Sequence, residues 1–146
     1  MSEIMRESHS VEETEAVAAE VAATLLGGEC IALEGDLGAG KTQFVRGLVR
    51  ALGGDPRAVS SPTFVLLHVY DSGRLRVFHL DAYRVHGSED FDSIGFTELL
   101  EQNGVVVVEW PSRVQSLLPA NHIRISLESQ GENDRKITIM NLRSAT

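Results

Sequence analysis

A glycine-rich octapeptide, GDLGAGKT over residues 35–42, has the residue types and spacing that bind phosphate. It fits the pattern G-x-x-x-x-G-K-[ST] at every fixed position. The glycines let successive backbone N–H groups point inward at an anion, and a helix beginning near Lys41 adds the positive end of its dipole. Lys41 can reach the β- and γ-phosphates, and the Thr42 hydroxyl can bind Mg²⁺. The residues that we expect to bind the nucleotide are Gly35, Asp36, Leu37, Gly38, Ala39, Gly40, Lys41 and Thr42.

Hydrolysis of a bound nucleotide also needs a carboxylate for the metal and a group that positions the attacking water. Two acidic residues end apolar runs: Asp81 follows residues 77–80, and Glu109 follows the four valines at 105–108. Each could be a solvated acid at the end of a strand. In a chain that carries a phosphate-loop pattern, their placement favours a role in the site, so we predict catalytic roles for both.

Three other residues are candidates with open alternatives. Thr63 precedes an apolar run, and its hydroxyl can swing to the γ-phosphate and Mg²⁺, as in switch segments; the alternative is a turn residue that follows Pro62. Trp110, the single tryptophan, either plugs a strand end or anchors a partner. We expect His79 to be a half-buried strand residue rather than a base. Arg84 either neutralises phosphate charge or pairs with Asp81.

The elements that position these residues follow from hydrophobic spacing. A short apolar strand before the octapeptide and an amphipathic helix after it form the strand–loop–helix context that the phosphate pattern requires. Either Thr14 or Ser10 could cap an earlier helix, and Glu13 follows Ser10 at the spacing of a capping box. The predicted helices are 11–26, 41–52 and a stretch that starts at Ser88, breaks at Gly95 and resumes over 97–102. The predicted strands are 30–34, 64–70, 74–81, 105–109, 122–128 and 136–142.

This order predicts one α/β fold, a three-layer P-loop NTPase-like domain. Its central strands are parallel, with antiparallel additions and a C-terminal β-hairpin, and ligands bind beyond the carboxyl ends of the strands. We expect residues 1–10 to be a flexible N-terminal tail and residues 11–146 to form a single P-loop ATPase domain. A chain of 146 residues is long enough to bury a core without disulfides.

Composition narrows the possible partners. The net charge is −8, from 13 Lys and Arg against 21 Asp and Glu, and no basic run offsets it. Such a surface repels a phosphodiester backbone, so we expect no strong direct nucleic-acid binding. No stretch approaches the ~20 apolar residues that span a bilayer, so we expect no membrane association. The polar residues 1–10 predict no signal peptide, and a single cysteine suits the cytoplasm.

Four short blocks, taken together, resemble one bacterial family. They are Gly35–Thr42, Ser61–Phe64 (SPTF), His79–Arg84 (HLDAYR) and Val108–Pro111 (VEWP). In residues, order and spacing they are similar to the TsaE family, also called YjeE, and the resemblance covers nearly the whole chain. Every block but the first is weak alone, whereas the four together are specific. Ala82 stands where many members have leucine, which we expect to leave the chemistry unchanged.

The resemblance implies a Mg²⁺-dependent ATPase that supports synthesis of N6-threonylcarbamoyladenosine next to the anticodon of tRNA. It would act on the TsaB–TsaD protein complex, contact tRNA only indirectly, and hydrolyse ATP slowly when alone. By the family pattern, the loop holds the phosphates of ATP, and Thr42 and Glu109 bind Mg²⁺. Thr63 lies in a switch-like segment, and Asp81 positions water or supports the metal. The family also places nucleotide contacts in its N-terminal segment and C-terminal hairpin, where Arg135 is the nearest basic candidate.

Three alternatives compete with this hypothesis. A small-molecule or nucleotide P-loop kinase would transfer phosphate to an acceptor, but the arginines are dispersed and little chain remains for a lid. A GTPase switch would use residues 92–95, which match D-x-x-G, yet no N-K-x-D base-reading motif occurs. A nucleotide-gated binding module without catalysis would bind ATP and leave it intact.

Two substitutions separate phosphate binding from metal-dependent hydrolysis. Lys41→Ala should remove phosphate binding, because it deletes the charge that faces the phosphates. Glu109→Ala should mainly weaken Mg²⁺-dependent hydrolysis. Nucleotide binding and ATP turnover across a series of Mg²⁺ concentrations measure both. Unchanged hydrolysis by Glu109→Ala over that series would remove Glu109 from the metal site.

Overall fold

The computed structural model describes residues 2–36, 38–60, 67–71, 73–83 and 95–142. Over these residues the strands are β1 (Ser2–Ser8), β2 (Cys30–Glu34), β3 (Leu67–Tyr70), β4 (Val77–Asp81), β5 (Val105–Glu109), β6 (Ile123–Ser129) and β7 (Arg135–Asn141). The helices there are α1 (Val11–Ala22), α2 (Lys41–Ala51) and α4 (Phe96–Leu100), with the 3-10 helices η1 (Pro56–Ala58) and η2 (Pro111–Leu117). None of these described helices has the length and apolar character needed to cross a membrane.

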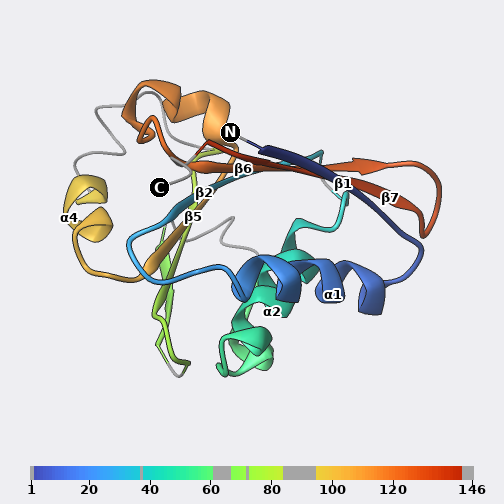
Figure 1. Cartoon of the computed structure of the whole chain (residues 1–146), viewed down its shortest axis with the longest axis horizontal. Helices are drawn as coiled ribbons and strands as arrows, with labels where there is room; N and C mark the ends of the chain where they lie inside the picture. Colours follow the sequence, from blue (N-terminus) through green and yellow to red (C-terminus); the bar gives the residue numbers. More distant parts are fainter. Residues whose placement is uncertain (1, 37, 61–66, 72, 84–94, 143–146) are drawn as a thin grey trace.

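The described strands make one seven-stranded sheet in the order β1-β7-β6-β2-β5-β4-β3 (Figure 1). β6, β2, β5 and β4 run parallel to one another. β3 is antiparallel to β4 at one edge, and β7 and β1 are antiparallel additions beside β6. The predicted parallel centre, antiparallel additions and C-terminal hairpin are therefore confirmed. Every residue of β5 is buried, as a central strand covered on both faces requires.

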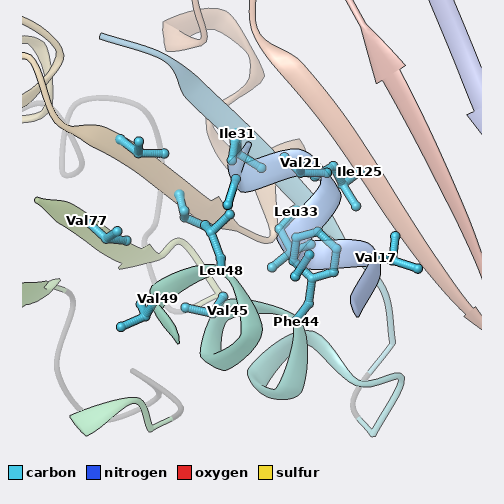
Figure 2. Packing of buried hydrophobic residues seen from close by; sticks show 14 of the residues in the cluster. Val17, Val21, Ile31, Leu33, Phe44, Val45, Leu48, Val49, Val77 and Ile125 are labelled. Carbon is cyan, nitrogen blue, oxygen red and sulfur yellow. The ribbon is translucent and has the colours of Figure 1, made fainter. Parts of the chain in front are cut away.

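Buried hydrophobic side chains form two clusters, one on each face of the sheet. Along β5, Val105 and Val107 join the cluster under α1 and α2, whereas Val106 and Val108 join the cluster that includes Phe96 of α4. The period-two alternation of a strand produces this division. Helices therefore cover both faces of the sheet. Figure 2 shows the first cluster, in which α1, α2 and the strands meet through Val17, Val21, Ile31, Leu33, Phe44, Val45, Leu48, Val49, Val77 and Ile125.

The N-terminal segment is a strand, so the prediction of a flexible tail over residues 1–10 is wrong. β1 pairs with β7 along its whole length, from Ser2 opposite Asn141 to Ser8 opposite Arg135. Its side chains are exposed except Ser8, so the segment lacks an apolar signature. Backbone pairing with β7 places it, together with polar contacts to α1 such as Ser8 Oγ to Thr14 Oγ1 at 2.7 Å. The predicted helix cap next to it is confirmed, because the Ser10 side chain accepts a hydrogen bond from the Glu13 N–H at 3.1 Å.

Several predicted boundaries move for local reasons. α1 ends at Ala22 instead of residue 26, because the chain tightens into i→i+3 bonds such as Thr24 N to Val21 O. β4 begins at Val77 instead of residue 74, because the Arg74 backbone N–H donates to the Leu52 carbonyl after α2 at 2.7 Å instead of to a neighbouring strand. The predicted strand residues 64–66 and the helical stretch from Ser88 lie outside the described residues.

Gly47 allows α1 and α2 to approach closely, and it provides a test of this packing. A Cβ at Gly47 would lie 2.6 Å from the Glu15 Cα of α1. Alanine is favoured over glycine inside a helix by roughly 0.5–1 kcal/mol, whereas overpacking a well-packed interface costs about 1–3 kcal/mol. We therefore expect Gly47→Ala to lower the free energy of unfolding by about 1 kcal/mol in urea denaturation. A gain in stability would contradict this account of the interface.

Candidate nucleotide-phosphate site

The octapeptide forms the turn between the central strand β2 and helix α2, as its pattern predicts. Gly38 and Gly40 have φ of 82° and 100°, in the left-handed region that glycine adopts without strain. Lys41 is the first residue of α2, and Thr42 follows it in the first turn. The predicted strand–loop–helix context is therefore confirmed, and the N-terminus of α2 directs its dipole at the loop. Leu37 lies outside the described residues.

The parallel strands bring the two predicted carboxylates together beside this loop. Asp81, the last residue of β4, is the register partner of Glu109, the last residue of β5. Glu109 is also the register partner of Leu33 in β2, one residue before that strand ends. Both carboxyl side chains are buried, with residue exposures of 5% for Asp81 and 4% for Glu109. The strand-end placement is confirmed, whereas the catalytic and metal-binding roles stay predictions.

Lys41 connects the loop to these acids. Its residue exposure is 6%, and its Nζ lies 3.7 Å from Glu109 Oε1 and 3.9 Å from the centroid of the Trp110 ring. Burial lowers the pKa of the Lys41 ammonium, and the charges of Glu109 and Asp81 partly oppose that shift. Although Nζ is buried, it has no hydrogen-bond partner within the described chain. A buried ammonium beside a glycine turn, paired with Glu109 at only 3.7 Å, has donor capacity left for an anion such as phosphate.

The environment of Asp81 disfavours its charged form. Burial is the largest cause that raises the pKa of this carboxyl, and the nearby charge of Glu109 raises it further. The Tyr83 N–H, which donates to Asp81 Oδ1 at 2.8 Å, and the charge of Lys41 oppose the shift. A carboxyl of raised pKa in a buried site is suited to exchange a proton or to gain a cationic partner on ligand binding.

His79 belongs to the same group of buried residues, so the prediction of a half-buried side chain is wrong. Its residue exposure is 0%, and its Nε2 lies 2.5 Å from Glu109 Oε2. The signal was available in the sequence, since His79 stands two residues before Asp81 in the same strand and therefore shares its face. The sequence does not indicate that β5, which ends at Glu109, is the strand beside β4.

Trp110 occupies the position expected of a plug at the strand end. Its ring lies over the Lys41 ammonium, and its centroid is 5.0 Å from that of Tyr83. The backbone of Trp110 is left-handed, with φ of 58°, immediately before η2 begins at Pro111. Such a conformation is uncommon for a bulky residue and persists only when surrounding contacts hold it, as they do at many functional sites.

Arg135, at the start of β7, lies against the phosphate loop. Its Nε donates to the Ala39 carbonyl at 3.0 Å and its Nη2 to the Gly38 carbonyl at 3.1 Å. Its Nη1 donates to carbonyls of the β6–β7 turn, including that of Asp134 at 2.9 Å. The guanidinium thus joins the loop to the hairpin through backbone carbonyls. The predicted contact of Arg135 with a nucleotide stays a prediction.

Two hollows adjoin the loop. The larger is a cleft of about 570 Å³ at the carboxyl ends of the strands, lined by Glu34, Gly35, Asp36, Trp110, Pro111, Ser112, Ser126, Leu127, Glu128 and Ser129. The smaller, of about 130 Å³, is lined by Ser10, Val11, Thr14, Gly38, Gly40, Gln43, Asn133 and Arg135. The N-terminal segment and the hairpin therefore meet beside the loop.

A metal ion beside the loop would need ligands beyond the described His, Cys, Asp and Glu side chains. No group of three or more His, Cys, Asp or Glu side chains among them is arranged to hold a metal ion alone. This is compatible with Mg²⁺, which is commonly bound through one or two carboxylates together with substrate phosphates and waters. Thr63 and Arg84 lie outside the described residues, so the structure leaves their predicted roles untested.

The fold and this group of side chains define an α/β protein with a phosphate-loop sequence at the carboxyl edge of its sheet. Comparison with known proteins identifies the family: residues 8–137 match the model of "Threonylcarbamoyl adenosine biosynthesis protein TsaE". The chain belongs to the TsaE family, as the four sequence blocks indicate.

Relatives and a solved structure agree with this family. The TsaE protein of Treponema pallidum is 42% identical over 132 residues, which cover 90% of this chain and 96% of that protein. The TsaE protein of Bacillus subtilis is 39% identical over 127 residues, covering 87% and 78% respectively. A crystal structure of YdiB from Bacillus subtilis superposes with a TM-score of 0.80 at 31% identity, covering 97% of this chain and 86% of that one.

The raised pKa of Asp81 generates a prediction about stability. The pKa of Asp81 in the folded protein lies above its usual value of 3.8, so ionised Asp81 destabilises the fold when the pH is above that raised pKa. The destabilisation fades as the pH falls toward 3.8, because the carboxyl is then protonated in both the folded and the unfolded protein. We expect Asp81→Asn in nucleotide-free protein to raise the Tm at pH 7 by a few degrees, as about 1 kcal/mol does for a domain of this size. The gain should shrink toward pH 4.

Asp55 supplies the matched control. The Arg57 side chain holds the pKa of this exposed carboxyl below its usual value. Asp55→Asn should therefore change Tm little, and in the destabilising direction. Thermal denaturation of both variants at pH 7 and pH 4 makes the comparison. An unchanged or lowered Tm for Asp81→Asn at pH 7 would contradict the electrostatic description of Asp81.

Proposed function

We propose that this protein is a Mg²⁺-dependent ATPase that acts in the cytoplasm and supports synthesis of N6-threonylcarbamoyladenosine next to the anticodon of tRNA. The observation that carries the proposal is the buried Lys41 ammonium. It lies at the start of α2 behind a phosphate-loop sequence, 3.7 Å from Glu109, without a hydrogen-bond partner in the described chain. Membership of the TsaE family supports the link to tRNA modification.

Each side chain of the site has a role in this proposal. The backbone N–H groups of residues 35–42 and the Lys41 ammonium bind the phosphates of ATP. Thr42 and Glu109 hold Mg²⁺, which neutralises charge on the phosphates when bound. Asp81 positions the attacking water or supports the metal, and its raised pKa reflects a buried site that gains from an added cation. Thr63 is proposed as the switch residue that responds to the γ-phosphate.

The smaller hollow is our candidate for the rest of the nucleotide. It adjoins the loop at Gly38 and Gly40, and its other walls come from Ser10 and Thr14 of the N-terminal segment and Asn133 of the hairpin. These are the two regions where the TsaE resemblance places nucleotide contacts. Small polar side chains there can bind a ribose or a base by hydrogen bonds, while Arg135 holds the walls together.

The protein partner in this proposal is the TsaB–TsaD complex. A net charge of −8 disfavours direct binding to a tRNA backbone, so contact with tRNA would pass through the complex. ATP hydrolysis would permit repeated turnover by that complex. A factor of this kind hydrolyses ATP slowly when alone, because its partners complete or open the site.

A pull-down with purified TsaB and TsaD, with and without ATP, tests this proposal. We expect capture that depends on nucleotide and an ATPase rate that changes at least severalfold when both partners are present. Lys41→Ala should lose both effects. Arg50→Ala is the matched control, because Arg50 is an exposed cation near the other end of α2. Failure to bind in either nucleotide state would overturn the partner assignment, and phosphate transfer to an acceptor would favour a kinase.

A further inference from the structure

We infer that His79 is a positioning residue that orients the Glu109 carboxylate, so that one carboxylate oxygen is committed to the histidine and the other faces the nucleotide site. This inference rests on the proposed role of Glu109 in binding Mg²⁺. The inference gives a role to the buried His79 imidazole, which has none in the proposed function.

The two Glu109 oxygens lie in different environments. Oε2 is 2.5 Å from His79 Nε2, whereas Oε1 is 3.7 Å from Lys41 Nζ. A carboxylate that binds a metal ion is ionised and can only accept hydrogen bonds, so in the inferred arrangement the Nε2–H of His79 donates a hydrogen bond to Oε2. Oε1 faces the phosphate-binding lysine and remains the oxygen for a metal ion or its water. The hydrogen bond therefore fixes Oε2 and leaves Oε1 available to a ligand.

The other side of the imidazole is also held. Nδ1 lies 3.1 Å from the Tyr70 hydroxyl, which lies 3.5 Å from the Ser60 carbonyl and 3.4 Å from His68 Nδ1. The single Tyr70 hydroxyl proton has three acceptors in reach, and His79 Nδ1 is the nearest of them, so a neutral imidazole with its proton on Nε2 can accept a hydrogen bond from Tyr70 at Nδ1. Burial raises the pKa of Tyr70, which keeps that hydroxyl protonated. In the arrangement that we infer, this contact favours the tautomer in which His79 donates to Glu109.

The strands make this arrangement rigid. Tyr70, His79 and Glu109 lie on β3, β4 and β5, which are neighbours in the sheet. The imidazole is fully buried between them, so its ring cannot rotate without disturbing packed neighbours. Partners of this kind hold metal ligands in place, and their loss typically weakens metal affinity or activity by 10–100-fold. A histidine that only satisfied its own buried polar atoms would not affect metal binding.

His79→Leu tests the inference, because leucine fills a similar volume without an N–H donor. We expect the Mg²⁺ concentration for half-maximal ATP hydrolysis to rise by about 10–100-fold. Binding of Mn²⁺ to the nucleotide complex, followed by electron paramagnetic resonance, should weaken by the same factor. Binding of a fluorescent ATP analogue in EDTA should change by less than about threefold, because the metal is absent. His79→Gln, whose amide can donate to Glu109, should restore most of the Mg²⁺ dependence.

Phe78→Leu is the matched control for stability. Phe78 is the preceding residue of β4, is buried, and belongs to the cluster on the opposite face. It should lower Tm without moving the Mg²⁺ dependence. An equal shift in Phe78→Leu and His79→Leu, or an unchanged Mg²⁺ dependence in His79→Leu, would overturn the inference. If His79→Leu does not fold, failure of a folded His79→Gln to retain near-normal Mg²⁺ dependence would overturn it.

A spectroscopic readout separates this inference from the proposed function. The His79 Nε2 proton should give a downfield imidazole resonance in nucleotide-free protein, and Glu109→Ala should abolish it. Absence of that resonance in the native protein would overturn the inference about His79. A protein that shows the resonance but neither binds nor hydrolyses ATP would instead overturn the proposed function. The hydrogen bond between His79 and Glu109 would then exist, but Glu109 would have no Mg²⁺ to bind and the positioning role would fall with the proposed function.

Discussion

Burial of the Lys41 ammonium is the constraint on which the rest of the site depends. Taking a charge out of water is expensive unless other groups compensate for it. Here Glu109, Asp81 and the face of Trp110 compensate in part, yet burial still lowers the pKa of the lysine and Nζ lacks a hydrogen bond within the described chain. The site is therefore electrostatically incomplete, in the sense that an anion with several oxygens would complete it.

The sheet makes this incomplete arrangement possible. Parallel strands end at the same edge, so register alone places Asp81, Glu109 and the loop after β2 within reach of one another. The two packed faces of the sheet hold those strand ends against motion. The packing on the two faces of the sheet therefore determines both the stability of the core and the geometry of the site. Burial raises the pKa of Asp81, so the fold by itself disfavours the charge on this carboxyl.

The hairpin and the N-terminal strand add a second layer of support around the loop. β1 pairs with β7, and Arg135 at the start of β7 donates to carbonyls of the phosphate loop. His9 pairs with Asp134 of the β6–β7 turn through an exposed contact of 2.9 Å. These contacts connect the two ends of the described chain to the loop, and Ser10 and Arg135 both line the smaller hollow beside it.

The sequence by itself determined the phosphate loop, the central strands and the two acids at their ends. Those features depend on local pattern: glycine spacing, a run of valines, and an acid after an apolar run. It also carried enough residues in four blocks to indicate the family. It did not reveal β1, because an exposed edge strand needs no apolar alternation, and its only signature is pairing with a strand about 130 residues away.

Tertiary structure alone decided which side chains act on one another. His79 became a partner of Glu109, and Arg135 a partner of the loop carbonyls, across 30 and 96 residues of chain. Such contacts are set by strand register and by the directions of side chains on neighbouring elements, which no local pattern encodes. The sequence thus determined which reactive side chains the chain carries. The fold decided which oxygen, nitrogen or ring lies next to each charge, because the distances between these groups are set only when the strands pair.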